Sequence, residues 1–215
     1  MKLYTYWRSS AAYRVRIALE LKGLSYESVP KHLLRDGGEQ RRADYLELNP
    51  QGLIPGFEDD GFFLGQSLAI CEYLEETCPA PPLLPADPRG RATVRSMALA
   101  VACDIHPLNN LRVQQYLRDE LGQGEEAVAR WTRHWMSRGF TALEGLVARH
   151  SADGRHCFGT SVTLADVCLV PQLYNARRFD VPLDAYPTLL RADANAAKLD
   201  AFVRAHPDNQ RVPSK

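Results

Sequence analysis

The stretch RSSAAYRVRIAL, residues 8–19, decides how the fold begins. It follows a short β-rich run over residues 2–6. We expect a helix over residues 14–22, because Val15, Ala18 and Leu19 fall on one face and Gly23 is a typical helix stop. A second β-rich run follows at residues 26–29. The pattern therefore predicts that the chain opens with a strand, a helix and a second strand.

The next fifty residues extend this pattern to a small α/β domain. A polar run over residues 35–42 leads into a short helix, which we expect to end before Pro50, because the residue before a proline avoids the α region. The turn at residues 59–61, Asp-Asp-Gly, lies between two apolar runs and predicts a β-hairpin. We expect Ser67 to cap the helix that follows. The predicted order over residues 1–80 is βαβ, helix, ββ, helix.

Beyond residue 78 the chain changes character. Five prolines between positions 79 and 88 favour a linker, because proline cannot continue a helix. Helical periodicity then dominates, and the stretch that begins at Thr163 has a capping-box pattern with Asp166. We expect an α/β domain over 1–80, a linker over 81–90 and an all-helical domain over 91–215. The expected helices cover residues 91–121, 125–149, 163–179 and 187–205.

The composition argues against several classes of function. The 26 basic and 26 acidic residues balance, so nothing favours nucleic acid as a partner. No apolar run reaches the length of a membrane span, and the first residues lack the apolar core of a signal peptide. The five cysteines form no C-x-x-C pair and have no metal-ligand spacing, so we expect no metal. Cys71, Cys103 and Cys168 lie in apolar stretches where cysteine usually packs as a small hydrophobe. A reducing cytoplasm fits this usage.

Three short motifs in the first domain indicate a binding site. Ser9 and Ser10 follow Arg8 at a helix start, where a hydroxyl and free N–H groups favour an anion. Ile54-Pro55 stands before the hairpin, where backbone groups can pair with an extended peptide. Gln66-Ser67 begins another helix. Each motif also has an ordinary structural explanation: the serines as helix caps and the proline as an edge-strand residue.

Taken together, these motifs resemble the glutathione transferase family. The resemblance implies a thioredoxin-like first domain that binds glutathione and a helical second domain. It also implies that Ile54-Pro55 holds the cysteinyl backbone of glutathione, that Gln66-Ser67 holds the γ-glutamyl end, and that Gln51 meets the glycyl end or the nearby backbone. The stretch at 8–19 is similar to the zeta-class signature R-S-S-C-x-W-R-V-R-I-A-L, and NPQG at 49–52, QSLAI at 66–70, DIHPLNN at 104–110 and LVPQ at 169–172 are similar to that class as well.

The zeta-class resemblance implies a glutathione-dependent cis–trans isomerase of a maleyl acid, such as maleylacetoacetate, in aromatic amino acid catabolism. A serine would activate the thiol, Ser9 in preference to Ser10, with Arg8 beside it. Cations and amides of the helical domain would hold the substrate. The candidates are His106, Asn110, Arg112 and Arg178, with Arg177 as the alternate to Arg178. His106 and Asn110 are four residues apart, so we expect them to share a helix face.

The resemblance further implies a homodimer, in which Asp104 would reach the partner's glutathione. Ala11 departs from the family motif, which usually has cysteine there, and this leaves maleylpyruvate open as the substrate. Three other functions stay open: a conjugating transferase, a non-catalytic glutathione-binding module, and a disulfide oxidoreductase. The last would need a cysteine at the start of the first helix. As structural alternatives, the histidine and arginines of the helical domain would simply face solvent.

Overall fold

The computed structural model describes residues 1–210, which divide into two compact units. The first comprises Met1–Pro82 together with residues 198–210, and the second comprises Leu83–Ala197. Within the described residues no helix is both long and apolar enough to cross a bilayer. The same residues hold no group of three His, Cys, Asp or Glu side chains arranged for a metal ion.

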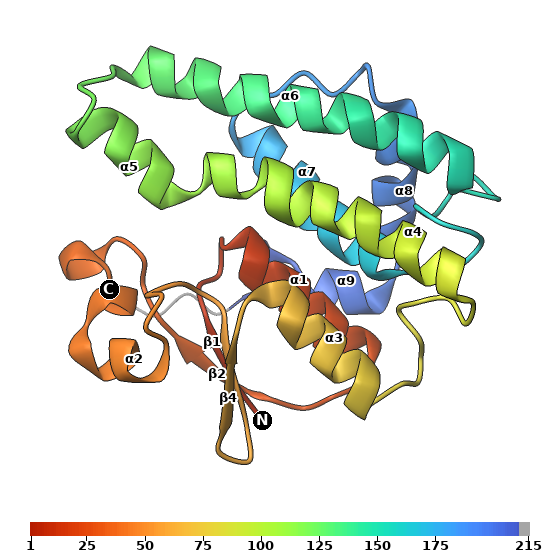
Figure 1. Ribbon diagram of the computed structural model, residues 1–215, viewed down its shortest axis with the longest axis horizontal. Coiled ribbons are helices and arrows are strands. Elements are labelled where there is room, and N and C mark those ends of the chain that lie inside the picture. The colour runs from red at the N-terminus through yellow and green to blue at the C-terminus, as the bar shows by residue number, and fades with distance from the viewer. Residues whose placement is uncertain (211–215) are drawn as a thin grey trace. The chain divides into compact units, whose positions relative to one another are not determined.

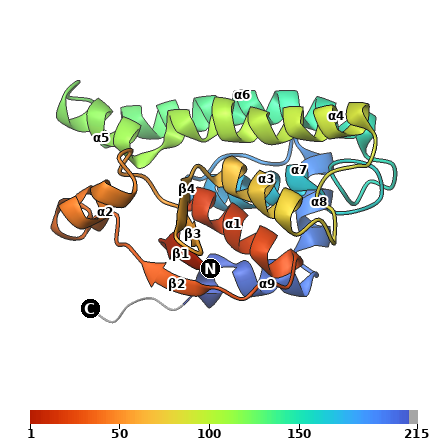
Figure 2. The same ribbon diagram turned by 60° about the horizontal axis from the view of Figure 1, so that its bottom comes forward.

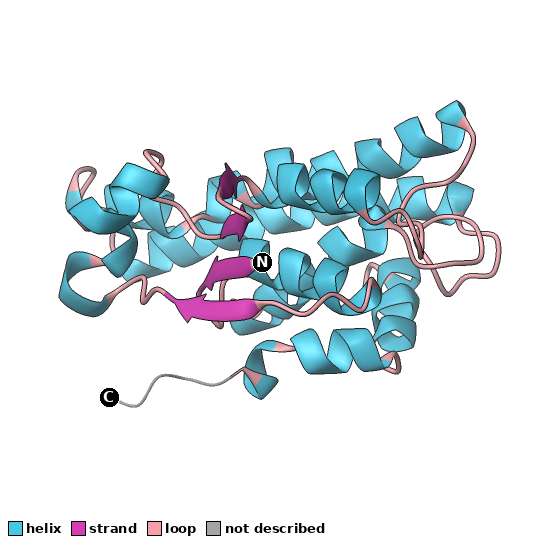
Figure 3. Cartoon of the chain, turned by 90° about the horizontal axis from the view of Figure 1, so that it is seen from below, coloured by secondary structure: helices cyan, strands magenta, loops and turns pink. Residues whose placement is uncertain are grey.

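A four-stranded mixed sheet forms the centre of the first unit (Figure 3). Its order is β2-β1-β3-β4, with β1 parallel to β2 and antiparallel to β3. The expected hairpin is confirmed, since Asp60 and Gly61 both take positive φ angles, as a tight hairpin turn requires. The predicted α/β, thioredoxin-like class is confirmed by this sheet. The strands are β1 (Lys2–Thr5), β2 (Glu27–Pro30), β3 (Gly56–Asp59) and β4 (Phe62–Gly65).

Helices cover both faces of the sheet. Alternate residues of β1 point to opposite faces: Tyr4 packs on Tyr45 of α2, whereas Thr5 accepts a hydrogen bond from Arg16 of α1. Helices α1 and α3 lie side by side (Figure 2), and α9 packs on α1. The helices are α1 (Ser10–Leu21), α2 (Ala43–Leu48), α3 (Ser67–Thr77) and α9 (Asp200–Ala205), and the short 3₁₀ turns are η1 (Arg35–Gly37), η2 (Glu39–Arg41) and η5 (Pro207–Asn209).

Two buried cations of α1 and its cap hold this unit together. Arg16 donates to Ala205 O at 3.1 Å, Thr5 Oγ1 at 3.1 Å and Trp7 O at 3.0 Å, which joins α9 and the β1–α1 connection to α1. Lys22 follows α1, and its ammonium group donates to Glu75 at 2.8 Å, Cys78 O at 2.6 Å and Pro81 O at 3.1 Å. Lys22 thus fixes the end of α3 and the start of the proline-rich segment.

The second unit is helical, as expected, but its first long helix is interrupted (Figure 1). The expectation of one continuous helix over 91–121 is wrong. A π-helical turn and then a 3₁₀ turn break it, the second beginning at Pro107, which lacks an N–H for a helix. The expected helix over 187–205 also ends early, at Ala196. The elements are α4 (Pro88–Leu99), η3 (Ala100–Ile105), η4 (Pro107–Asn109), α5 (Leu111–Asp119), α6 (Glu125–His150), α7 (Leu164–Arg178) and α8 (Pro187–Ala196).

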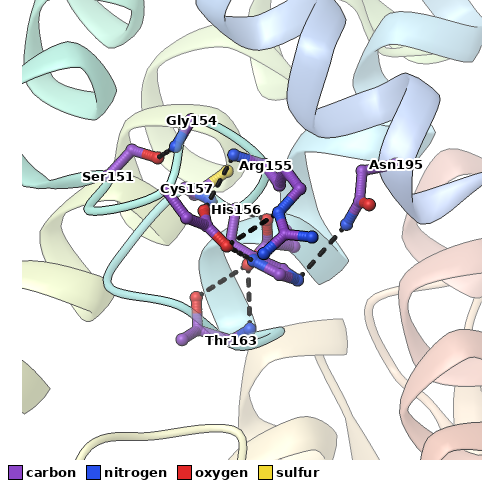
Figure 4. Close-up of polar contacts among 9 residues, drawn as sticks. Ser151, Gly154, Arg155, His156, Cys157, Thr163 and Asn195 are labelled. Carbon is purple, nitrogen blue, oxygen red and sulfur yellow. Dashed lines mark hydrogen bonds and ion pairs between the residues drawn. The ribbon is translucent and has the colours of Figure 1, made fainter.

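A buried carboxylate organises the loop before α7 (Figure 4). Asp166 accepts from the backbone N–H groups of Cys157 and Thr163, each at 2.8 Å, and from the Thr163 hydroxyl at 3.0 Å. The predicted capping box is therefore confirmed. Nearby, the His156 ring lies 3.1 Å from Asp153 and 3.3 Å from Asn195. These contacts give the loop a fixed conformation, and they have a structural role.

The cysteines differ in exposure. Cys71, Cys157 and Cys168 are buried, whereas Cys103 is exposed on the π-helical turn. The expectation that Cys103 packs as a small hydrophobe is therefore wrong, because the π-helical turn shifts the helix faces. Burial, with the Asp166 carboxylate as the next contribution, raises the pKa of the Cys157 thiol well above its usual value.

Candidate active site

The β1–α1 junction presents a serine hydroxyl at a helix start. Ser9 is the N-cap of α1, and its Oγ accepts the N–H of Ala12 at 3.2 Å. A capping oxygen that accepts a hydrogen bond still has its own hydrogen to donate. Ser9 is only half-buried, whereas Ser10 is 5% exposed and is the first residue of α1. The capping role and a role toward an anion are thus compatible in Ser9.

Arg8, the residue before Ser9, is held by aromatic side chains. Its guanidinium lies 4.6 Å from the centroid of the Trp7 ring, and Nη2 donates to the Tyr6 hydroxyl at 3.4 Å. Its Nε is buried and has no hydrogen-bond partner within residues 1–210. Stacking of this kind orients a guanidinium without neutralising it. The junction therefore carries a positioned cation close to the start of α1.

The loop before β3 contains a peptide unit without backbone hydrogen bonds to any of residues 1–210. The Leu53 carbonyl accepts from the Tyr45 hydroxyl and from Asn49 Nδ2, each at 2.8 Å. The next residue, Ile54, makes no backbone hydrogen bond within the described chain, and the Ile54–Pro55 bond is cis. An unpaired N–H and C=O in this position can accept an extended peptide as an added strand.

The start of α3 brings two predicted ligand residues together. Gln66 Nε2 donates to Gln51 Oε1 at 2.7 Å, across fifteen positions of sequence. Gln66, rather than Ser67, is the cap position, with φ of 67°, so the expectation that Ser67 caps this helix is wrong by one residue. No side chain caps the helix, and Ser67 is its first residue. The first N–H groups of α3 therefore meet no capping side chain.

Sequence reasoning missed the partner of Ser67. Arg14 of α1 is buried, and its Nη1 donates to Ser67 Oγ at 3.2 Å. The signal available in the sequence was a charged residue within an apolar helix, which helical periodicity alone interprets as a surface position. The contact joins the helix that follows β1 to the start of α3.

In the second unit the interrupted helix separates residues expected to share a face. His106 ends the π-helical turn, whereas Asn110 has extended backbone angles and caps α5, accepting the Arg112 N–H at 3.1 Å. The expected i, i+4 relation of His106 and Asn110 is therefore wrong, since no continuous helix joins them. Asp104 lies exposed on the π-helical turn.

The two arginines at the end of α7 have different partners. Arg177 forms an ion pair with Asp193 at 2.6 Å. Arg178 donates to the Asn175 amide oxygen at 3.2 Å, and its guanidinium lies 5.7 Å from the centroid of the Phe179 ring. Arg177 is thus engaged by a carboxylate of its own unit. Because Arg177 is already paired with a carboxylate, Arg178 is the better candidate of the two to bind an anionic ligand.

Comparison with known proteins extends these observations to the whole chain. Residues 1–76 match the model of the glutathione S-transferase N-terminal domain. A maleylacetoacetate isomerase of Pseudomonas aeruginosa is 54% identical over 211 residues, which cover 98% of this chain and 97% of that protein.

Two solved structures are similar over the whole chain. A maleylpyruvate isomerase, described as a bacterial zeta-class glutathione S-transferase, has a TM-score of 0.94 and 48% identity, covering 98% of both chains. A maleylacetoacetate isomerase of Methylobacterium extorquens AM1, solved with malonate and glutathione bound, has a TM-score of 0.93 and 44% identity, also covering 98% of both chains.

Proposed function

Because the chain belongs to the zeta class of the glutathione S-transferase family, we propose that it is a glutathione-dependent cis–trans isomerase that converts maleylacetoacetate to fumarylacetoacetate. The observation that carries the proposal is the contact between Gln51 and Gln66 beside Ser67. The resemblance implies all three as glutathione ligands, and Gln51 lies fifteen positions before Gln66 in the sequence. A relative solved with malonate and glutathione bound supports binding of both a small dicarboxylate and the tripeptide.

Each group of the first unit has a distinct task in this proposal. Glutathione supplies a thiolate that adds reversibly to the maleyl double bond, so that the bond can rotate before the thiolate leaves. Ser9 donates its hydroxyl hydrogen to that sulfur, and the start of α1 adds a positive field, which together favour the ionised thiol. Ile54 and Pro55 hold the cysteinyl backbone, Gln66 and Ser67 hold the γ-glutamyl end, and Gln51 meets the glycyl end or nearby backbone.

The substrate needs fixed cations because it is an anion. Arg8 takes this role in the first unit, and Arg178 in the second, where a guanidinium fork suits a carboxylate. The engagement of Arg177 by Asp193 supports this choice. His106, Asn110 and Arg112 are the further candidates. Asn110 and Arg112 share a turn at the start of α5, which supports treating them as one group.

A second candidate substrate is maleylpyruvate. The observation that favours it is Ala11, which stands in the first turn of α1 where the family motif has cysteine. A maleylpyruvate isomerase of the zeta class is also among the similar structures. Both substrates require the same reaction at the double bond and differ in the group next to it.

We further propose a cytoplasmic homodimer in which Asp104 contacts the glutathione of the partner subunit. The exposure of Asp104 supports a role outside its own fold. Sedimentation velocity at micromolar concentration tests the assembly, and a monomer across that range contradicts it.

The test of the function is glutathione-dependent turnover of maleylacetoacetate and of maleylpyruvate, followed in parallel with conjugation of an aryl halide. We expect faster turnover of maleylacetoacetate and none without glutathione. Faster turnover of maleylpyruvate would make maleylpyruvate the preferred substrate and maleylacetoacetate the second candidate. Retention on immobilised glutathione with no isomerisation of either acid would contradict the proposal, favouring a conjugating transferase if the aryl halide reacts and a binding module if it does not.

A further inference from the structure

Helix α1 contains two buried arginines that differ in how many of their nitrogens have a hydrogen-bond acceptor. Arg14 and Arg16 are each 1% exposed. Arg16 has an oxygen acceptor for each of its three nitrogens. Arg14 has one, Ser67 Oγ, and its Nε and Nη2 have no hydrogen-bond partner within residues 1–210. A buried guanidinium with unsatisfied hydrogen-bond donors destabilises the folded state, so the burial of Arg14 needs an explanation.

The contact with Arg14 fixes what Ser67 can do. A serine hydroxyl has one hydrogen to give and two lone pairs that accept. Because Arg14 donates to the oxygen, the hydroxyl hydrogen of Ser67 remains available to an acceptor outside the contact. A donor that is itself hydrogen-bonded to a cation is also more polarised, and so binds a negative acceptor more strongly.

The surroundings of Ser67 favour the same kind of ligand. The start of α3 has no capping side chain, because Gln66 turns its amide to Gln51 and takes a positive φ angle. Free N–H groups at a helix start and a buried cation next to the first residue both attract an anion. The idle donors of Arg14 therefore mark a positive charge that is left uncompensated until an anion arrives.

We propose that Arg14 is a positioning residue for the γ-glutamyl carboxylate of glutathione, an inference that rests on the proposed function. It does not touch the ligand. It orients Ser67 as a donor and supplies the charge that complements the carboxylate from within the protein. Arg16, in the same helix and equally buried, is the matched example of a structural arginine, since all its nitrogens serve protein acceptors.

The experiment combines variants of Arg14 with a ligand that lacks the γ-glutamyl carboxylate. Calorimetry measures binding of glutathione and of 4-aminobutyryl-cysteinyl-glycine, which lacks only the γ-glutamyl carboxylate. The wild type should prefer glutathione by roughly tenfold or more, as a charge-assisted contact implies. Arg14→Met should lose most of that preference by binding glutathione more weakly while its affinity for the analogue stays the same. Arg14→Lys should keep part of the preference, because the charge remains.

Arg16→Lys is the control. It should lower the melting temperature and leave the preference between the two ligands at the wild-type value. If Arg14→Met weakens both ligands equally, Arg14 is structural and the inference is overturned. If Arg14→Met does not fold, Arg14→Lys and Ser67→Ala decide. The inference requires Arg14→Lys to lose part of the preference for glutathione and Ser67→Ala to lose most of it, and an unchanged preference in either variant overturns the inference.

The same titration separates this inference from the function. A wild type that binds glutathione without isomerising either maleyl acid overturns the proposed isomerase and leaves the role of Arg14 to be decided by the variants. A wild type that binds neither tripeptide overturns both.

Discussion

Replacing Lys22 by methionine tests how much one buried ammonium group contributes to the first unit. Its side chain is fully buried, and Nζ has three oxygen partners: Glu75, Cys78 O and Pro81 O. Methionine has a similar length but no donor. The variant leaves the buried Glu75 carboxylate without this cation and deprives two carbonyl groups of a donor.

The magnitude follows from the pair that is broken. Removing one partner of a buried ion pair costs about 3–5 kcal/mol, because the remaining charge stays in a poor solvent. One kcal/mol lowers the melting temperature of a chain of this size by about 2–4 °C. The Lys22→Met variant should therefore melt roughly 6–20 °C below the wild type. Circular dichroism melts and urea titrations measure both quantities.

Two companion variants make the interpretation specific. Lys2→Met removes the ion pair with Glu58, which is 2.9 Å long, close to the 2.8 Å of the Lys22–Glu75 pair, but has a lysine side chain that is 43% exposed. This change should alter stability by no more than about 1 kcal/mol. In Lys22→Met with Glu75→Leu, the stranded charge is gone, so much of the loss should return. The carbonyls of Cys78 and Pro81 still lack their donor. A Lys22→Met protein as stable as Lys2→Met would refute the reasoning.

Further predictions concern the chemistry and pH response of single groups. Ser9→Ala should raise the thiol pKa of bound glutathione by about one to two units toward its ordinary value near 8.5, seen as loss of thiolate absorbance at neutral pH; an unchanged pKa would remove Ser9 from the role. Arg178→Ala should weaken the maleyl substrate about tenfold and leave glutathione affinity alone, measured as a change in KM. Cys103 is exposed and should be alkylated first, whereas Cys157 is buried, has a raised pKa and should be alkylated last. Mass spectrometry of a time course measures this order, and glutathione-dependent turnover should remain intact. Burial raises the pKa of Asp166 in the folded state, so this group stabilises the fold below its ordinary pKa of about 3.9 and loses that contribution as pH rises through the raised value. Relative to Asp166→Asn, the free energy of unfolding of the wild type should therefore increase as pH falls from 7 to 4.5. The opposite trend would show that the hydrogen bonds accepted by the carboxylate outweigh its burial.

The sequence predicts the elements of the first unit because its signals are local. The Asp60-Gly61 turn requires positive φ angles that glycine readily adopts, and the hairpin is found where expected. Helix α1 begins at Ser10, four residues before the predicted start at residue 14. The sequence does not distinguish Ser9 as a loop residue from Ser9 as a helix cap, whereas the structure shows that its Oγ accepts the Ala12 N–H. Gln66 is similar: nothing in its side chain predicts a left-handed backbone.

The helical unit was predicted less well where the apolar pattern continues across a break. The π-helical turn at Ala100–Ile105 shifts the helix faces without interrupting the run of apolar residues. Periodicity therefore assigned His106 and Asn110 to one face. The burial of Arg14 could not be predicted for a related reason. A charged side chain in a helix is normally expected to face solvent, whereas in the structure Arg14 is buried and donates to Ser67.

The packing of α9 on α1 has a consequence for how the protein is made. The carbonyl that Arg16 needs belongs to Ala205, 189 residues further along the chain. At a ribosomal rate of about 5–20 residues per second, that acceptor is synthesised roughly 10–40 s after the arginine. During this interval the nascent first unit has its sheet and α1 but lacks the helix that completes it, while the whole helical unit is being translated. The first unit is therefore consolidated only after the whole helical unit has been synthesised, and a chain released before Ala205 would carry a buried guanidinium without one of its acceptors.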